Sequence, residues 1–306
     1  MREHTRAFFF FESFGAPDRL VGAGARAAGA LAALLVTVTG ATALAQPAAE
    51  AAEDAAARSG RGFIETPVFT AEQDEQLLAL FDGLRVADVT DGMDAVGLVN
   101  TGLMDPEILP LWKDTARFTH RFIGIAVTAR YVPTQRPPAG IRPAEEYDEW
   151  SGDWYSTLSP EPFAELIRPG TALVLDDAPR ADVGSIGSNN ILAWKLRGMV
   201  GVVTNATARD TDEIVTERVP LYFRHPGRGI RPGRNEIESV NRPIVCGGVL
   251  VVPGDVIVAD GDGVVVVPRG VAAEVARYAH RILEGDKAGR RQLYEKLGLP
   301  KDPSVE

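Results

Sequence analysis

The sequence predicts an α/β protein, and three segments in the middle of the chain carry that prediction. Residues 171–175 form a short apolar strand after a Pro-Gly turn. Residues 189–197 have the apolar spacing of a helix, and Gly198 stands where helices commonly end. Residues 199–204 form a second strand of buried type. A strand, a helix and a strand in this order predict a parallel, right-handed βαβ unit.

Helices are predicted on both sides of this unit. Thr70 followed by Gln73 is a capping-box pattern, and an apolar stripe continues it as a helix over 71–84. A second short helix is expected over 86–96. A last helix is expected over 270–296, with a packing stripe made of Val275, Tyr278, Ala279 and Ile282.

Short strands surround the central unit. Residues 123–131 alternate and are rich in β-branched side chains, which favours a strand. Pro253-Gly254 fits a type II turn, and two Asp-Gly pairs at 260–263 lie between apolar runs, as in a hairpin. The acidic residues at 260–263 lack the spacing and the closing Glu of an EF-hand calcium loop, so we interpret them as turn chemistry.

Residues 133–162 interrupt this pattern. They hold many prolines together with Tyr147, Trp150, Trp154 and Tyr155. We interpret the segment as a long insertion, either a surface loop held down by its aromatic side chains or a lid over a binding site.

The N-terminus has the features of an export signal. Residues 27–45 carry no charge, Arg26 precedes them, and they end in Ala43-Leu44-Ala45, a small-x-small pattern. We predict a signal peptide over 1–45 and an exported protein, periplasmic or secreted. The alternative is an uncleaved membrane anchor. Residues 46–62 are predicted to be a flexible linker, and 63–306 one α/β domain.

Composition excludes some functions. The net charge of −10 argues against a nucleic-acid partner, which needs a basic face. The single cysteine, Cys246, makes no internal disulfide and is expected to be buried.

His120 and His225 are too isolated to indicate zinc. The basic stretch Arg228, Arg231 and Arg234 is interpreted as a solvated loop, or else as a substrate or subunit contact.

The strongest site pattern lies between Gly187 and Glu213. Gly187 opens the helix that begins near Asn189, and a helix N-terminus attracts carboxylate or phosphate groups. Arg209 and Asp210 follow the carboxyl end of the 199–204 strand, where α/β proteins bind ligands. The Arg fork can bind a carboxylate and the Asp can hold Mg²⁺ or Mn²⁺. Adjacent in sequence, the two side chains are expected to point in different directions. The alternative is a surface Arg–Asp pair.

Motifs over residues 80–285 resemble the RraA-like family, whose members include 4-hydroxy-4-methyl-2-oxoglutarate aldolases and regulators of ribonuclease activity. The resemblance begins at 86–93 and continues through 187–190, 198–203, 208–210, 220–223, 251–255 and 259–268.

The resemblance implies a compact β/β/α sandwich of the swivelling-domain type, with flanking helices, assembled as a homotrimer or hexamer. It implies that Gly187, Ser188, Asn189 and Asn190 contact the substrate through backbone N–H groups. It further implies that Arg209 binds the carboxylate or keto oxygen of a small keto acid and that Asp210 ligates a divalent cation, Mg²⁺ or Mn²⁺. Glu213 is implied to lie near the metal without binding it directly.

One position departs from the family pattern. Active aldolases of the family place an acidic residue directly after the loop glycine, where this chain has Ser188. A serine hydroxyl does not replace a carboxylate as a base. Three hypotheses follow: a metal-dependent lyase acting on a 4-hydroxy-2-oxo acid or oxaloacetate, a non-catalytic binding protein that keeps the anion pocket, and a ribonuclease regulator.

Overall fold

The structure is a computed structural model that describes residues 62–137, 139–177 and 182–305, together with residues 52, 55 and 57–60. The chain divides into two units, Met1–Phe63 and Ile64–Glu306. The predicted signal peptide lies outside the described residues, and so does most of the predicted linker. Within the described part, no helix combines the length and the apolar character that a membrane span needs.

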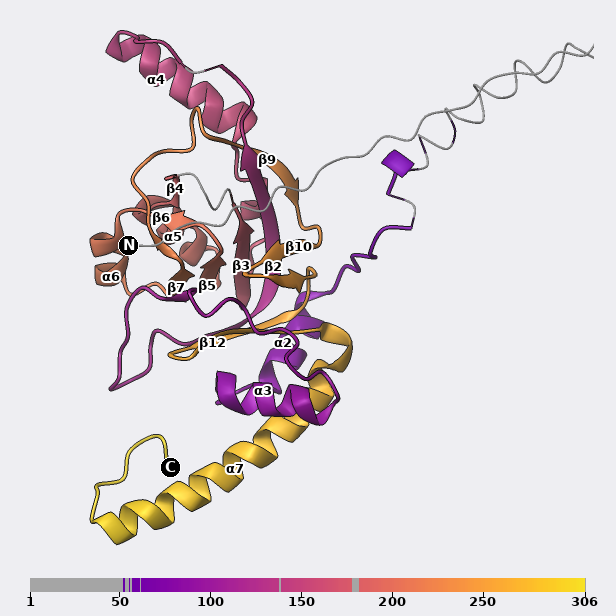
Figure 1. The fold of residues 1–306 in the computed structure, drawn as a ribbon, viewed down its shortest axis with the longest axis vertical. Coiled ribbons are helices and arrows are strands. Elements are labelled where there is room, and N and C mark those ends of the chain that lie inside the picture. Colours follow the sequence, from indigo (N-terminus) through magenta and orange to yellow (C-terminus); the bar gives the residue numbers. More distant parts are fainter. Residues whose placement is uncertain are drawn as a thin grey trace, which may run out of the picture. The chain divides into compact units, whose positions relative to one another are not determined.

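A mixed sheet of eight strands forms the centre of the second unit, and the α/β class is confirmed (Figure 1). Four strands run parallel in the order β7-β5-β3-β2, namely Leu221–Phe223, Met199–Thr204, Thr171–Asp176 and Phe122–Pro133. Antiparallel strands flank them: β1 (Leu109–Pro110), β12 (Val256–Asp260), β13 (Gly263–Val267) and β9 (Asn235–Val240). The predicted parallel βαβ unit is therefore present.

The sheet is nearly closed, because the chain before β1 pairs with the far edge strand β13. The Met104 amide donates to the Val264 carbonyl at 3.1 Å, and the Val266 amide donates to the Gly102 carbonyl at 2.8 Å. Closure of this kind covers edge groups that would otherwise stay unpaired. It encloses an apolar interior that includes Phe122, Tyr222 and the buried thiol of Cys246, as predicted for that cysteine.

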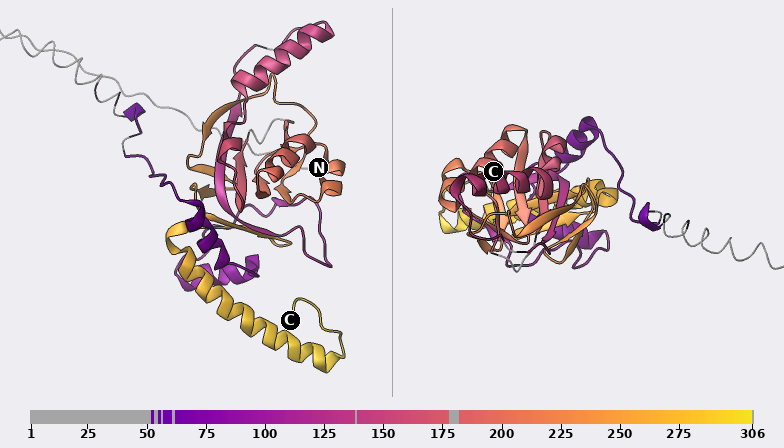
Figure 2. Two further views of the ribbon diagram at one scale, coloured as in Figure 1. Left: turned by 180° about the vertical axis from the view of Figure 1, so that it is seen from behind. Right: turned by 90° about the horizontal axis from the view of Figure 1, so that it is seen from above.

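Helices cover two regions of the sheet. The helices α2 (Ala71–Ala79), α3 (Val86–Ala95) and α7 (Ala272–Leu297) share a core with β12 and β13. Figure 2 shows α3 lying along the first half of α7. The helices α5 (Ser188–Leu196) and α6 (Thr211–Glu217) pack with β3 and β5 around Trp194, Ile191 and Ile214.

Short elements complete the fold. β4 (Gly184–Ile186), β6 (Thr207–Ala208) and β8 (His225–Pro226) form a small parallel sheet, and β10 (Ile244–Cys246) pairs with β11 (Val249–Val251). The predicted hairpin is β12–β13. The type II turn is consistent with Gly254 at φ +96° and with the Asp255 amide donating to the Val252 carbonyl at 3.0 Å.

The sequence misplaced several boundaries. The capping box at Thr70 forms, but the helix ends at Ala79 instead of residue 84, because the chain turns through Gly83 at φ +76°. The last helix begins at Ala272, after a 3₁₀ turn over Arg269–Val271. Tyr278 and Ile282 are only half-buried, whereas Ala276 and Leu283 belong to the core.

The loop interpretation of residues 133–162 is wrong for its centre. Residues Ala144–Asp153 form a helix, α4, followed by a π turn over Trp154–Leu158 and a 3₁₀ turn over Pro162–Leu166. Helix α4 buries none of its residues and projects from one end of the sheet (Figure 1). Trp154 is buried, and its indole N–H donates to the Asn235 carbonyl at 2.9 Å, which fixes the end of the helix.

Two glycines in helices test the packing of α3 on α7. A Cβ added at Gly92 would lie 2.7 Å from the Val275 carbonyl oxygen, whereas one added at Gly285 meets nothing within 4 Å. We expect Gly92→Ala to destabilise the protein by about 1–3 kcal/mol through overpacking. Gly285→Ala is the control and should stabilise it by about 0.5–1 kcal/mol through helix propensity. Urea unfolding of both variants measures the difference, and equal midpoints would contradict close packing at Gly92.

Candidate functional site

The two predicted site loops leave neighbouring parallel strands. Strand β4 ends at Ile186 and leads into Gly187, and its neighbour β6 ends at Ala208 and leads into Arg209. The Arg209 amide donates to the Ile186 carbonyl at 2.8 Å, so pairing continues one residue beyond β6. The residues predicted from two separate motifs therefore meet at the carboxyl ends of two strands, where α/β proteins bind ligands.

Asp210 connects the two loops. One carboxylate oxygen, Oδ2, accepts a hydrogen bond from the Ser188 amide at 3.1 Å, at the first residue of α5. Asp210 itself precedes α6 with a left-handed backbone, φ 54° and ψ 40°. Such a conformation is costly for residues other than glycine, and asparagine and aspartate adopt it most readily. The side chain is 35% exposed, so a ligand can still reach it.

Arg209 lies beside Asp210, and the expectation that the two side chains point in different directions is wrong. Arg209 Nε is 3.6 Å from Asp210 Oδ1. The left-handed turn at Asp210 brings its carboxylate back toward the preceding side chain. Because a Cβ at Gly184 would lie 2.6 Å from Arg209 Cβ, the glycine gives the arginine stem its space.

Gly187 leaves an open position beside both charged groups. A Cβ at this residue would lie 2.8 Å from Asp210 Oδ2 and 3.7 Å from Arg209 Nε. A side chain there would displace the carboxylate or occupy the space of a ligand. The glycine is thus needed for close approach of the backbone to a bound group.

The other predicted site residues have different surroundings. Asn189 is exposed, and the Asn190 amide donates to Glu161 Oε1 at 2.5 Å instead of facing open space. The Ser188 N–H is taken by Asp210. Glu213 is exposed on α6, one turn beyond Asp210. The structure thus brings together Gly187, Ser188, Arg209 and Asp210, with Asn190 linking them to a further acid.

That further acid, Glu161, was not singled out from the sequence. It accepts hydrogen bonds from Asn190, from the Trp194 indole at 2.9 Å and from Arg231. It stands at the end of the proline-rich segment, 29 positions before Asn190, with no motif around it. Only the tertiary fold reveals that it supports the helix that carries the site loop.

Arg231 corrects the interpretation of the basic stretch as a solvated loop. Its side chain is 3% exposed, and it forms an ion pair with Glu161. It also donates to the Tyr131 hydroxyl and the Ser159 carbonyl, each at 3.1 Å, and to the Ser185 carbonyl at 3.2 Å. Arg228, in contrast, is exposed and pairs with Asp182.

The neighbours of Arg231 favour the charged form of its guanidinium group. Burial opposes the charged form, but nearby Tyr131 and Glu161 raise the pKa of the guanidinium above its ordinary value. Burial also raises the pKa of the Tyr131 hydroxyl. At neutral pH the phenol is therefore neutral and the guanidinium is charged, which fixes their roles as hydrogen-bond acceptor and donor.

A second buried network fixes strand β4. Ser185 Oγ donates to Asp177 Oδ2, and the Asn235 amide donates to Asp177 Oδ1 at 2.8 Å and to Ser185 Oγ at 3.0 Å. Asn235 is fully buried. Because Ser185 lies just before Gly187, these bonds set the position from which the site loop starts.

The side chains at this site fit a divalent cation that has one protein ligand and is coordinated mainly by substrate oxygens and water. In the described part of the chain, no group of three or more His, Cys, Asp and Glu side chains could form a metal cage. Asp210 offers one partly exposed carboxylate. Magnesium is commonly bound by one or two carboxylates, with waters and substrate oxygens completing its shell. Asp210 therefore suits Mg²⁺ or Mn²⁺ and does not suit a structural zinc.

A family model and a relative of known name both match this chain, and they point to the same family. The family model of RraA-like proteins, described as Aldolase/RraA, matches residues 86–266. A relative from Halalkalibacterium halodurans is 30% identical over 176 residues, which cover 56% of this chain and 80% of the relative. The name of that relative proposes a 4-hydroxy-4-methyl-2-oxoglutarate aldolase.

Solved structures share the fold. An uncharacterised protein from Pseudomonas syringae pv. tomato is 25% identical, with a TM-score of 0.56, over 74% of this chain and 95% of its own. RraAS2 from Streptomyces coelicolor, described as an unusual member of the RNase ES inhibitor family, is 23% identical, with a TM-score of 0.55. It is matched over 74% of this chain and 98% of its own, and the expected sandwich fold is confirmed.

The Glu161–Arg231 pair allows a direct test of how the site is supported. We expect Glu161→Gln to destabilise the protein by about 1–3 kcal/mol, because it leaves the buried Arg231 cation without its counter-charge. Glu165→Gln is the matched control from the same segment: Glu165 is 76% exposed and pairs with half-exposed Arg197. That change should stay within about 0.5 kcal/mol. Thermal unfolding measures both, and an equal loss in the two variants would contradict the role of Glu161.

Proposed function

The chain belongs to the RraA-like family, and on that premise we propose that it is a divalent-metal-dependent carbon–carbon lyase. The substrate is a 4-hydroxy-2-oxo acid, or oxaloacetate, and the product is pyruvate. The observation that carries the proposal is the meeting of Arg209 and Asp210 with the Gly187 loop at the ends of β4 and β6. The name of the relative from H. halodurans supports the substrate class.

The site favours an α-keto acid. The Arg209 guanidinium is 38% exposed and can bind the substrate carboxylate through two hydrogen bonds. The first turn of α5 presents N–H groups and a partial positive charge next to it. The missing side chain at Gly187 leaves room for the keto-acid end against Asp210.

Asp210 would hold the cation, with the keto acid and water completing the shell. The bound cation supplies Lewis-acid polarisation of the keto oxygen. Glu213 on the next turn of α6 would act on waters around the cation, not on the cation itself. Asp210 is fixed for this role by the Ser188 amide and by its own left-handed backbone.

The cleavage is a retro-aldol reaction. The 4-hydroxyl loses its proton and becomes a carbonyl, and the C3–C4 bond breaks. Its electron pair moves to C3 and the C2 keto oxygen, giving the enolate of pyruvate, which then takes a proton at C3. Arg209 and the α5 N-terminus favour the enolate because both place positive charge where negative charge develops.

Ser188 supports a second candidate, a protein that binds a keto acid without turning it over or that regulates another protein. At the position of the family acid, the serine hydroxyl is a far weaker base than a carboxylate. A regulator of ribonuclease activity is the protein-binding form of this candidate, in keeping with the description of RraAS2. Slow turnover in the wild type is expected for the same reason.

Assembly and location belong to the proposal. A homotrimer or hexamer is supported by exposed apolar side chains on the two helices that follow the site loops: Leu192 at 40% and Leu196 at 90% on α5, and Val215 at 40% on α6. Exposed apolar side chains on neighbouring helices suit a contact between subunits. Export to the periplasm or the medium rests on the signal pattern of residues 1–45 alone. Neither a nucleic-acid partner nor a membrane partner is proposed for the folded unit.

The lyase proposal is tested by pyruvate release from oxaloacetate and from 4-hydroxy-4-methyl-2-oxoglutarate with Mg²⁺ or Mn²⁺. We expect chelation to abolish turnover and Asp210→Ala to lower kcat/KM by about 100-fold, because the cation loses its only proposed protein ligand. Asp212→Asn is the control, because Asp212 is exposed on the same helix. It should keep full activity.

If neither substrate is turned over in the presence of the metal, the lyase hypothesis is wrong. A calorimetric titration with pyruvate or oxalate then tests the second candidate, a protein that binds a keto acid without turning it over. Binding that is lost in Arg209→Gln would support a keto-acid binding protein, and no binding would leave only a protein-regulatory role.

Restoring the family acid gives a gain-of-function prediction. We expect Ser188→Glu to raise kcat by about 10- to 100-fold, because a carboxylate can take the proton of the 4-hydroxyl group. An acid also suits the first turn of α5. Ser188→Gln is the isosteric control without a charge and should give no gain. Equal rates in wild type and Ser188→Glu would show that this position does not limit catalysis.

A further inference from the structure

A group of basic side chains lines a small cavity far from the site loops in sequence. The cavity has a volume of about 220 Å³ and lies between the turn after α2, the segment before β2, and the second half of α7 with the chain end. Four cations line it, Arg85, Arg121, Lys287 and Arg290, and none of its lining residues is acidic. The chain as a whole carries a net charge of −10, so this local excess of positive charge is unusual.

Three of the four cations make no close ion pair with any residue that the structure describes. Arg85 is neutralised by Asp88 and Asp286 at 2.5 and 3.1 Å. Arg121, Lys287 and Arg290 form no ion pair within the part of the chain that the structure describes. Arg290 makes one long hydrogen bond, 3.4 Å, to the Ser304 carbonyl. The Asp302 carboxylate lies near enough to Arg290 for their charges to interact, so the positive charge of the cavity walls is least compensated at Arg121 and Lys287.

Arg121 is held in a fixed orientation at the wall of the cavity. Its Nε is buried and makes no hydrogen bond. The guanidinium lies 3.8 Å above the ring of Phe118, which fixes its plane. Nε itself has almost no accessible surface, so an anion in the cavity would contact the terminal nitrogens of this half-buried side chain.

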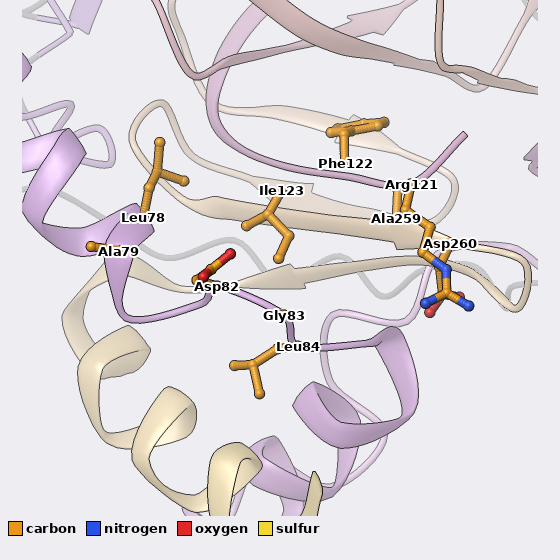
Figure 3. Close-up of a pocket in the computed structure, with 10 residues that line it drawn as sticks. All are labelled: Leu78, Ala79, Asp82, Gly83, Leu84, Arg121, Phe122, Ile123, Ala259 and Asp260. Carbon is orange, nitrogen blue, oxygen red and sulfur yellow. The ribbon is translucent and has the colours of Figure 1, made fainter. Parts of the chain in front are cut away.

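Arg121 and Gly83 also line a larger cavity of about 610 Å³, shown in Figure 3. Its walls include Leu78, Leu84 and Ile123 together with the exposed side chain of Asp82. In that view Arg121 and Asp260 lie at the opposite end from Leu78. The Asp260 carboxylate is already used, because it accepts from the Val86 amide at 3.0 Å and the Asp262 amide at 2.8 Å. A volume of this size, with a mixture of apolar and charged walls, can hold a small organic ligand.

We propose that these adjoining cavities form a binding site for a small organic anion. Its phosphate or carboxylate group lies against Arg121, Lys287 and Arg290, and its apolar part extends past Gly83 between Leu78, Leu84 and Ile123. Gly83 allows the passage because a Cβ there would meet nothing within 4 Å. The site shares no residue with the Gly187 and Arg209 loops, so it does not depend on the lyase proposal.

Calorimetric titration of the full chain with inorganic phosphate and with 1-naphthyl phosphate tests the site, and citrate serves as the carboxylate probe. We expect saturable binding of at least one charged group, tighter binding of naphthyl phosphate than of phosphate, and weakening at high salt. Lys287→Gln/Arg290→Gln should weaken binding by about tenfold or more, since charged hydrogen bonds are lost. Both changes lie on the outer part of α7, so folding should survive them.

The matched control is Arg281→Gln/Lys296→Gln, which removes two exposed charges from the same helix that line neither cavity. It should leave affinity unchanged. Absence of saturable binding at about 10 mM of every probe, or equal weakening in both double variants, would overturn the site. Equal affinity for phosphate and naphthyl phosphate would overturn the extension into the larger cavity.

Discussion

The buried ion pair between Arg231 and Glu161 is the interaction on which the candidate site depends. Arg231 joins β2 through Tyr131, the proline-rich segment through Ser159, and β4 through Ser185. Glu161 in turn joins Asn190 and Trp194 of α5. A charge buried this deeply is costly unless it is fully paired, so the pair forces four distant segments into one arrangement. That arrangement positions the beginning of α5, where the Gly187 loop lies.

Asp210 has a similar function on a smaller scale. Its left-handed backbone and its bond to the Ser188 amide couple the loop after β4 to the loop after β6. The same geometry brings Arg209 against the carboxylate, so a cation and an anion stand side by side before any ligand arrives. In the proposed lyase, a keto acid with a divalent cation would present the matching pair of charges to these two adjacent residues of opposite sign.

Charge is unevenly distributed over this acidic chain. Acidic residues dominate the total, yet four cations line one cavity beside α7. The pattern could not be found in the sequence, because Arg121 and Lys287 are separated by most of the folded unit. Closure of the sheet and the packing of α7 bring their surroundings together. Net charge therefore described the whole molecule correctly and gave no information on this surface.

The sequence by itself determined the α/β class, the parallel βαβ unit, the β12–β13 hairpin and the proximity of Gly187 to Arg209 and Asp210. Each rests on local periodicity, turn residues or strand ends, which neighbouring residues settle. Only the tertiary structure decided the helix within 133–162, the burial of Arg231 and the role of Glu161. The burial of Arg231 and the role of Glu161 depend on partners up to 100 positions away. A single basic or acidic residue looks the same in sequence whether it is solvated or paired inside the fold.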